Sequence, residues 1–291
     1  MSALSPTLTL RRSRRRARVW HGVMVYALLA ILLAFSLLPI YWLLATSFKT
    51  RFDIFANPGQ FFPFPFTLHA YQQVLSDPHF LTYFKNSLIV NLATSLITVA
   101  LALLAGYSFS RFRFRGNQAL LLFILATQMF PSAVLLLSLY ILFRQLHLLN
   151  TYPALIISYV TFGLPFSIWM MKGFADGVPE EIEQAAMIDG CSRMQALLRV
   201  VVPMLVPGMI AVALFSFLAG WNDLMWSLTL TSSTSMRLIP PGFILTYVGQ
   251  FQTYWNQLMA GSVLVSIPTV AVFTLLQRYL VQGLTSGGVK G

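Results

Sequence analysis

The chain carries one polar stretch that stands out from its surroundings, Val178-Pro-Glu-Glu-Ile-Glu-Gln-Ala-Ala-Met-Ile-Asp-Gly190, which continues through Cys-Ser-Arg-Met-Gln to Pro203. Long apolar segments lie on both sides of it. Five of the chain's eight acidic residues fall in this neighbourhood: Asp176, Glu180, Glu181, Glu183 and Asp189. We interpret the stretch as a docking element that a membrane scaffold holds out into the cytoplasm.

The composition is that of an integral membrane protein. The 291 residues are 57% hydrophobic and only 9% charged, whereas soluble domains carry about 25% charged residues. The net charge of +11 would suit a nucleic-acid-binding protein. The basic residues instead cluster between and beside the apolar segments, so no nucleic-acid partner is expected. A single cysteine, Cys191, excludes an internal disulfide framework.

Six apolar segments of about 20 residues are long enough to cross the roughly 30 Å hydrocarbon layer. Backbone groups in lipid must bond within the chain, so each segment is expected to be helical. Prolines inside or near the span ends are expected to kink some of these helices. The predicted spans are Val23–Ser47, Ser87–Ser110, Gln118–Leu142, Tyr152–Met171, Met204–Leu224 and Met259–Leu276.

Basic residues set the orientation of these spans. With six spans, 14 of the 19 lysines and arginines fall on the side of the N-terminus, which predicts that both termini are cytoplasmic. The tract Arg11–Arg18 is interpreted as a cytoplasmic anchor rather than a nucleic-acid arm or a signal peptide. The predicted layout is a basic tail (1–22), a six-helix transmembrane domain (23–280) and a cytoplasmic C-terminal tail (281–291). Outside the membrane, Thr67–Leu75 is predicted to form a short surface helix.

The spans offer little chemistry. Asp223 is the one acidic residue in them, and it suits either the outer membrane boundary or the lining of a solute path. No histidine pair, nucleophile motif or Walker-type loop is present, so no catalytic, metal or cofactor site is predicted. Polar uncharged residues in the spans suit hydrogen bonds between helices or a path for a hydroxyl-rich solute. The candidate path residues are Gln128, Asn222 and Trp221.

The acidic stretch has the features of a short capped helix. Pro179 fits the first turn, three glutamates follow it at the favourable end of the helix dipole, and Gly190 suits the C-terminal stop. The predicted helix has about eleven residues and a length of about 16 Å. A small apolar face permits close approach by a partner, and it comprises Ile182, Ala185, Ala186 and Met187. A second amphipathic run, Ser192–Val202, leads into the next span.

The segment Glu183-Gln-Ala-Ala-Met-Ile-Asp-Gly190, followed by Val200-Val-Val-Pro203, resembles the EAA loop of ATP-binding-cassette (ABC) importer permeases. Three other stretches resemble the carbohydrate branch, specifically the second permease of maltose-type importers: Ser47-Phe-Lys49, Trp221-Asn-Asp223 and Gln277-Arg-Tyr-Leu-Val-Gln-Gly-Leu-Thr-Ser-Gly-Gly-Val-Lys-Gly291. The resemblance implies an all-α integral membrane protein of the type I importer permease fold. It implies six transmembrane helices and a cytoplasmic coupling helix in a loop at about 173–203.

The resemblance also implies a function. The chain would be the permease subunit of a bacterial inner-membrane importer that moves a sugar or oligosaccharide. Its expected partners are a second permease, an external solute-binding protein and two ATPase subunits that hold ATP-Mg and dock on 178–203. The implied coupling residues are Glu180, Glu183, Gln184, Ala185, Ala186, Asp189 and Gly190. Within this class, glycerol phosphate or another polyol-like solute is the alternative substrate. A secondary transporter or a membrane enzyme is the alternative class.

The chain departs from the family motif at two positions. Gln184 stands where the family usually has a glutamate that resembles a charged anchor in a cleft of the ATPase. Glu183 or Glu180 could replace this charge after a small helix rotation. Cys191 stands where the family commonly has alanine, and both residues are small.

Overall fold

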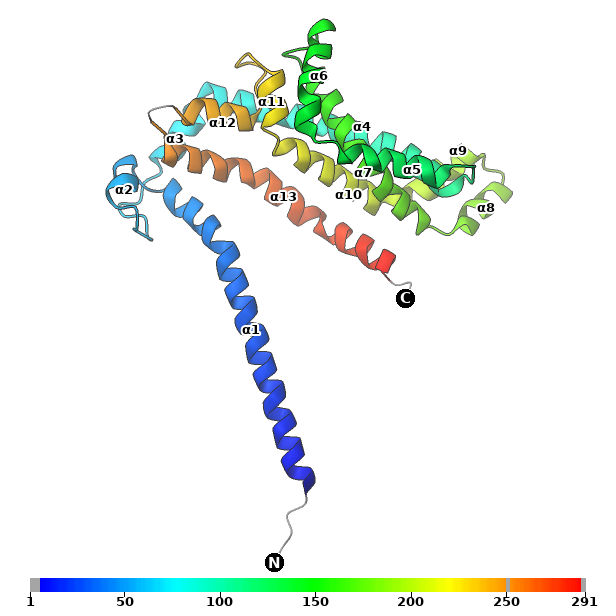
Figure 1. The fold of residues 1–291 in the computed structure, drawn as a ribbon, viewed down its shortest axis with the longest axis horizontal. Coiled ribbons are helices and arrows are strands. Elements are labelled where there is room, and N and C mark those ends of the chain that lie inside the picture. Colours follow the sequence, from blue (N-terminus) through cyan, green and yellow to red (C-terminus); the bar gives the residue numbers. More distant parts are fainter. Residues whose placement is uncertain (1–5, 250–251, 289–291) are drawn as a thin grey trace, which may run out of the picture. The chain divides into compact units, whose positions relative to one another are not determined.

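The computed structural model describes residues 6–249 and 252–288, and in these ranges the chain is almost entirely helical (Figure 1). The predicted all-α architecture is confirmed. The helices in chain order are α1 (Pro6–Ser47), α2 (Arg51–Ala56), α3 (His69–Ser76), α4 (Pro78–Arg111), α5 (Asn117–Ala126), η1 (Thr127–Met129), α6 (Ser132–Gln145), α7 (Tyr152–Asp176), α8 (Glu180–Ile188), α9 (Arg193–Ala196), η2 (Leu197–Val201), α10 (Val202–Trp221), α11 (Met225–Leu230), α12 (Ile239–Tyr247) and α13 (Trp255–Gly288).

Within the described residues, five helical segments and one bent pair are long and apolar enough to cross a membrane. The bent pair comprises Asn117–Met129 and Ser132–Gln145, which meet at 90°. The predicted third span, Gln118–Leu142, is therefore not one continuous helix. Pro131 has no backbone N–H and holds Phe130 in an extended conformation (φ −74°, ψ 127°), which ends the first half of the span.

The fifth predicted span also differs from the structure. It was expected to begin at Met204, but the helical segment begins at Arg193 and runs to Trp221. The reason is that the chain stays helical from α9 through the single π-helical turn η2 into α10. The helix ends before Asp223, so this acid lies in the short connection to α11 rather than in the span.

The chain forms two compact units, one of residues Met1–Tyr71 with Trp255–Val263 and one of Gln72–Tyr254 with Leu264–Gly291. The predicted surface helix corresponds to α3, and the hydroxyl of Thr67 caps it by accepting from the His69 backbone N–H (3.1 Å). The side chains of the predicted arginine anchor (11–18) and of the predicted C-terminal tail (281–291) lie outside the described residues.

The second unit is built on α4, α7 and α10, which pack against one another. Glycines let their backbones come close, as is common between membrane helices. A Cβ atom added at Gly208 would lie 2.5 Å from the ring of Phe174, and one added at Gly220 would lie 2.1 Å from the side-chain oxygen of Asn91. The three helices therefore form a tightly packed block.

We expect a Gly220→Ala variant to be less stable than the parent chain, because the new methyl group must push α10 away from α4. Overpacking of this kind costs about 1–3 kcal/mol. Gly163 in α7 is the matched control, since a Cβ there would meet no atom within 4 Å. Thermal unfolding of the purified protein in detergent would show a lower Tm for Gly220→Ala only. Equal Tm values for both variants would contradict the close packing.

Polar groups join this block to the segment before α12. The Asn86 amide donates to the backbone carbonyls of Ser235 (2.8 Å) and Arg237 (2.9 Å) and accepts from the hydroxyl of Tyr152 (2.7 Å). The Ser87 hydroxyl accepts from the Ile239 backbone N–H at 2.9 Å. At these positions, polar residues in the spans serve as links between elements, which is one of the two uses that their sequence pattern suggested.

Candidate functional site

The acidic stretch forms the short helix α8, and both of its ends are explained by local sequence. Pro179 lies one position before the helix instead of inside its first turn. At the other end, Gly190 adopts a left-handed conformation (φ 94°) that favours glycine. The N–H of Gly190 bonds to the carbonyl of Met187 (3.1 Å), and that of Cys191 bonds to Ala186 (3.0 Å). These two bonds form a Schellman motif, so α8 has nine residues rather than the expected eleven.

A second cap starts the next helix immediately. The Ser192 hydroxyl accepts from the Gln195 backbone N–H (3.3 Å), while the Gln195 side chain accepts from the Ser192 N–H (2.9 Å). This capping box fixes the start of α9, which continues through the π turn into α10. Because α8 packs against α9 and the π turn, it lies against the first turns of the helical segment that continues into α10.

The residues of α8 divide between two faces. The inner face carries buried Glu183 with half-buried Ala186 and Met187. The predicted apolar face is therefore split, because Ala185 points to the other side of the helix. The outer face is exposed and comprises Glu180, Glu181, Ile182, Gln184, Ala185 and Ile188. Of the other predicted coupling residues, Asp189 and Gly190 are also exposed.

A buried ion pair fastens the inner face of α8 to α4. The Arg111 Nε donates to Glu183 Oε2 at 3.0 Å, and the two side chains are only 6% and 5% exposed. The Tyr107 hydroxyl donates to the other carboxylate oxygen of Glu183. Arg111 Nη2 donates to the carbonyl of Val178 (2.7 Å), which precedes α8. Three residues from two helices thus form one polar cluster, and we call it the Glu183 cluster.

Helix dipoles favour the charges of the Glu183 cluster. Arg111 lies in the last turn of α4, where the helix dipole favours a cation, and Glu183 lies in the first turn of α8, where it favours an anion. Both oxygens of the carboxylate are already paired inside the chain. Glu183 is therefore engaged in contacts within the chain, and its replacement of the charge that Gln184 lacks stays a prediction. Of the two glutamates proposed for that role, only Glu180 is exposed.

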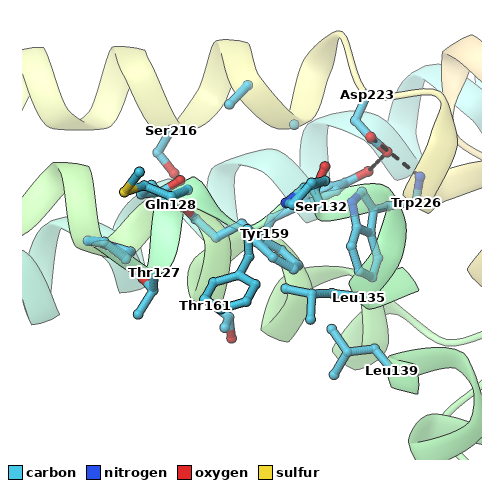
Figure 2. Close-up of a pocket in the computed structure, with 18 of the residues that line it drawn as sticks. Thr127, Gln128, Ser132, Leu135, Leu139, Tyr159, Thr161, Ser216, Asp223 and Trp226 are labelled. Atoms are coloured by element: carbon cyan, nitrogen blue, oxygen red, sulfur yellow. Dashed lines mark hydrogen bonds between the residues drawn. The ribbon is translucent and has the colours of Figure 1, made fainter. Parts of the chain in front are cut away.

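A cavity of about 770 Å³ lies in the second unit, where the broken span meets α7, α10 and α11 (Figure 2). The break itself contributes residues 127–132 to the lining. Met129 is 83% exposed and Phe130 66%, so the cavity is open on that side. Its volume lies in the range of small-molecule sites. Polar and aromatic side chains alternate around it, including Gln128, Ser132, Ser216, Tyr159, Phe162 and Trp226.

Asp223 lies at the edge of this cavity and also has a structural role. Its carboxylate accepts from the Tyr159 hydroxyl (2.8 Å) and from the backbone N–H groups of Ser227 (2.9 Å) and Trp226 (3.4 Å), as Figure 2 shows for two of these bonds. It thereby caps the first turn of α11 and orients a tyrosine of the cavity wall. The two sequence interpretations of Asp223, an outer membrane boundary and a solute path, both stay predictions. Its place among the lining residues is consistent with the second of them.

The three predicted path residues have different positions. Gln128 lines the cavity, and its amide donates to the Phe162 carbonyl at 2.6 Å. Trp221 is buried away from the lining, stacked on Phe217 at 5.1 Å between ring centroids. The Asn222 amide bonds back to the Leu218 carbonyl of its own helix (2.8 Å) and also lies outside the lining.

Comparison with known proteins places this geometry in a family. The model of the family described as "Binding-protein-dependent transport system inner membrane component" matches residues 98–286. The diacetylchitobiose uptake system permease protein DasC of Streptomyces coelicolor is 34% identical over 275 residues, which are 94% of this chain and 98% of that protein. The trehalose/maltose transport system permease protein MalG of Thermococcus litoralis is 36% identical over 265 residues (90% and 95% of the two chains).

A solved structure shares the fold. A chain in the crystal structure of a bacterial ABC transporter involved in the import of the acidic polysaccharide alginate superposes with a TM-score of 0.74. The two chains are 21% identical, and the match covers 96% of this chain and 99% of that one. At this identity the likeness concerns the fold alone.

Proposed function

Because this chain belongs to the family of binding-protein-dependent transport system inner membrane components, we propose that it carries a sugar or oligosaccharide across the bacterial cell membrane as one permease subunit of an ATP-driven importer. The chain is a transport component and not an enzyme. Permeases of this family work with a second permease, with ATPase subunits and with a solute-binding protein. The ATP-Mg that drives the cycle would be held by the ATPase subunits, and both termini of this chain would lie in the cytoplasm.

The observation that carries the proposal is the two-faced helix α8. Its inner face is tied to α4 by the Glu183 cluster, and its outer face offers small or apolar side chains at Ala185 and Ile188. Ile188 is 86% exposed, and it follows Ala185 at a spacing of three residues, which places both on the same side of the helix. Such a face suits a contact with another protein, and we propose that an ATPase subunit covers it. Closure of the two ATPases would then move α8, the base of α10 and the Glu183 cluster together.

The cavity supports a neutral, hydroxyl-rich solute. Aromatic rings such as Trp226 and Phe130 can cover the apolar faces of a sugar ring, while Gln128 and Ser132 offer donors and acceptors for its hydroxyl groups. No lysine or arginine occurs among the described lining residues, and Asp223 brings a negative charge to the edge. Both features disfavour an anionic solute such as glycerol phosphate at this surface.

The proposal predicts uptake that requires every partner. The chain would be reconstituted in proteoliposomes with its second permease, its ATPase and its solute-binding protein. Radiolabelled maltose, trehalose, diacetylchitobiose and glycerol 3-phosphate would be offered one at a time. We expect uptake of at least one of the sugars, only with ATP-Mg on the ATPase side and with the binding protein present. Uptake that continues without the ATPase and depends on an ion gradient would contradict the proposal. Uptake of glycerol 3-phosphate alone would contradict the sugar assignment.

A further inference from the structure

The segment between α1 and α3 exposes an unusual number of phenylalanines. Six of them lie within residues 51–66, which we call the phenylalanine loop, and each is between 56% and 79% exposed. Exposed aromatic residues at this density mark a surface that another apolar phase or protein covers. The six are Phe52, Phe55, Phe61, Phe62, Phe64 and Phe66.

The phenylalanine loop folds back along the span from which it emerges, within the first compact unit (Figure 1). The Phe61 ring lies 5.9 Å from that of Trp42 and 6.5 Å from that of Tyr41, measured between ring centroids. The Tyr41 hydroxyl donates to the Phe61 carbonyl at 2.8 Å. Tyr41 lies six residues before the end of α1, which is about 9 Å along the helix at 1.5 Å per residue. Phe61 therefore lies at the depth of residues that belong to the span.

Several backbone groups of the loop need no hydrogen bond from water. Prolines occupy positions 58, 63 and 65 and have no N–H group to satisfy. Carbonyls in the same region already accept hydrogen bonds. The Gln60 carbonyl accepts from the ammonium group of Lys49, and the Phe64 carbonyl accepts from the Gln60 side chain (3.1 Å). Leaving water costs a backbone group little when its hydrogen bonds are made within the chain.

A buried lysine fixes the loop in this position. Lys49 is only 2% exposed, and its ammonium group lies 4.9 Å from the centre of the Trp42 ring while it bonds to the loop. The contacts of Lys49 and Tyr41 hold residues 60 and 61 against the last two turns of α1. The apolar surface of the loop is consequently continuous with that of α1, in which no residue from Trp20 to Leu44 is buried.

We propose that the phenylalanine loop is a lipid anchor, inserted into the interfacial layer of the bilayer on the side where α1 ends. The lipid is favoured over a protein partner because Phe61 shares its depth with a span and because aromatic side chains gather at membrane interfaces. The anchor would hold the tip of α1 in the membrane while other helices move. The inference does not depend on which solute is carried.

Spin labels on the loop of the assembled, reconstituted transporter test this proposal. A Cys191→Ala background removes the native thiol, and Phe62→Cys and Phe64→Cys then introduce one label each. Leu33→Cys, in the middle of α1, supplies the lipid reference, and free label in buffer supplies the water reference. Only variants that retain ATP-driven uptake are labelled. Power saturation compares collisions with dissolved oxygen, which enters lipid, and with a water-soluble nickel chelate.

The lipid anchor predicts that labels at positions 62 and 64 collide with oxygen and are shielded from the chelate, as at position 33. Free access of the chelate at both positions would place the loop in water and overturn the proposal. Shielding from both reagents would mean that a protein covers the loop, and this result would also overturn it. Because two positions are labelled separately, failure of one variant to assemble leaves the other as the test.

Discussion

A Glu183→Ala variant of the assembled importer is expected to lose solute uptake while still inserting into the membrane. The substitution leaves the Arg111 guanidinium buried at the end of α4 without its counter-charge, and it removes the acceptor of the Tyr107 hydroxyl. Breaking a buried ion pair by removing one partner costs about 3–5 kcal/mol. This free energy is lost where α8 is fastened, so α8 should detach from α4 before the rest of the chain unfolds. ATP-driven uptake in proteoliposomes and the Tm of the purified chain measure the two effects.

Two further variants separate this role from a general effect of charge. Asp176→Ala removes an equal charge from the exposed ion pair with Lys172 and should leave uptake and Tm close to those of the parent, because exposed pairs contribute about 0–1 kcal/mol. Glu183→Gln keeps a hydrogen-bond acceptor of nearly the same shape and should fall between the two. Normal uptake and an unchanged Tm in Glu183→Ala would show that the Glu183 cluster does not fasten α8.

An Ala185→Asp variant is expected to abolish uptake by a different route, because the chain itself should fold normally. Ala185 is exposed on the outer face of α8, so a carboxylate there meets water in the isolated chain. At the proposed contact with the ATPase, the same carboxylate would be desolvated without a partner, at a cost of about 3 kcal/mol or more. An affinity loss of this size is more than about a hundredfold. Co-purification of the ATPase and ATP hydrolysis stimulated by the loaded binding protein should both disappear.

The same position provides the control for this second prediction. Ala185→Ser adds a small uncharged group and should keep most of the uptake. Gln184→Glu should also be tolerated, because it restores the residue that the family usually carries next to this alanine. If Ala185→Asp still recruits the ATPase and supports uptake, the outer face of α8 is not the docking surface. A lower Tm in Ala185→Asp alone would instead indicate that the residue packs inside the chain.

Several features of the fold could be predicted from the sequence because the membrane leaves few choices. Runs of about 20 apolar residues must be helical in lipid, and the predicted spans each correspond to a helix or to the bent pair. The bend at Pro131 was the exception. A proline inside a span can produce a kink or a complete break, and the local sequence does not record which of the two occurs. The extension of α10 back to Arg193 was hidden for a similar reason, since Pro203 resembles a helix start.

The candidate sites were predictable to a smaller extent. Caps at Gly190 and Ser192 follow from local chemistry, so the limits of α8 could be placed within two residues. The burial of Glu183 could not be predicted, because its partners Tyr107 and Arg111 lie more than 70 positions earlier in the chain. The cavity was located through Gln128 but not through Trp221 or Asn222. The side of α10 that faces the cavity depends on how α7 and α10 cross. The sequence around residue 222 does not contain that information.

The unbroken helical run from Arg193 to Trp221 would act as a lever in the proposed coupling mechanism. Its 29 residues span about 44 Å at 1.5 Å per residue. One end rests on α8, and the other reaches the cavity wall at Gly220. A tilt of about 5° at the α8 end would swing the far end by about 4 Å over that length. In the proposed importer, a short movement of the ATPases would thereby become a displacement of about 4 Å at the cavity, with the force reduced in the same ratio. The bending stiffness of this helical run, more than the binding affinity at either of its ends, would then limit how efficiently ATP hydrolysis drives transport.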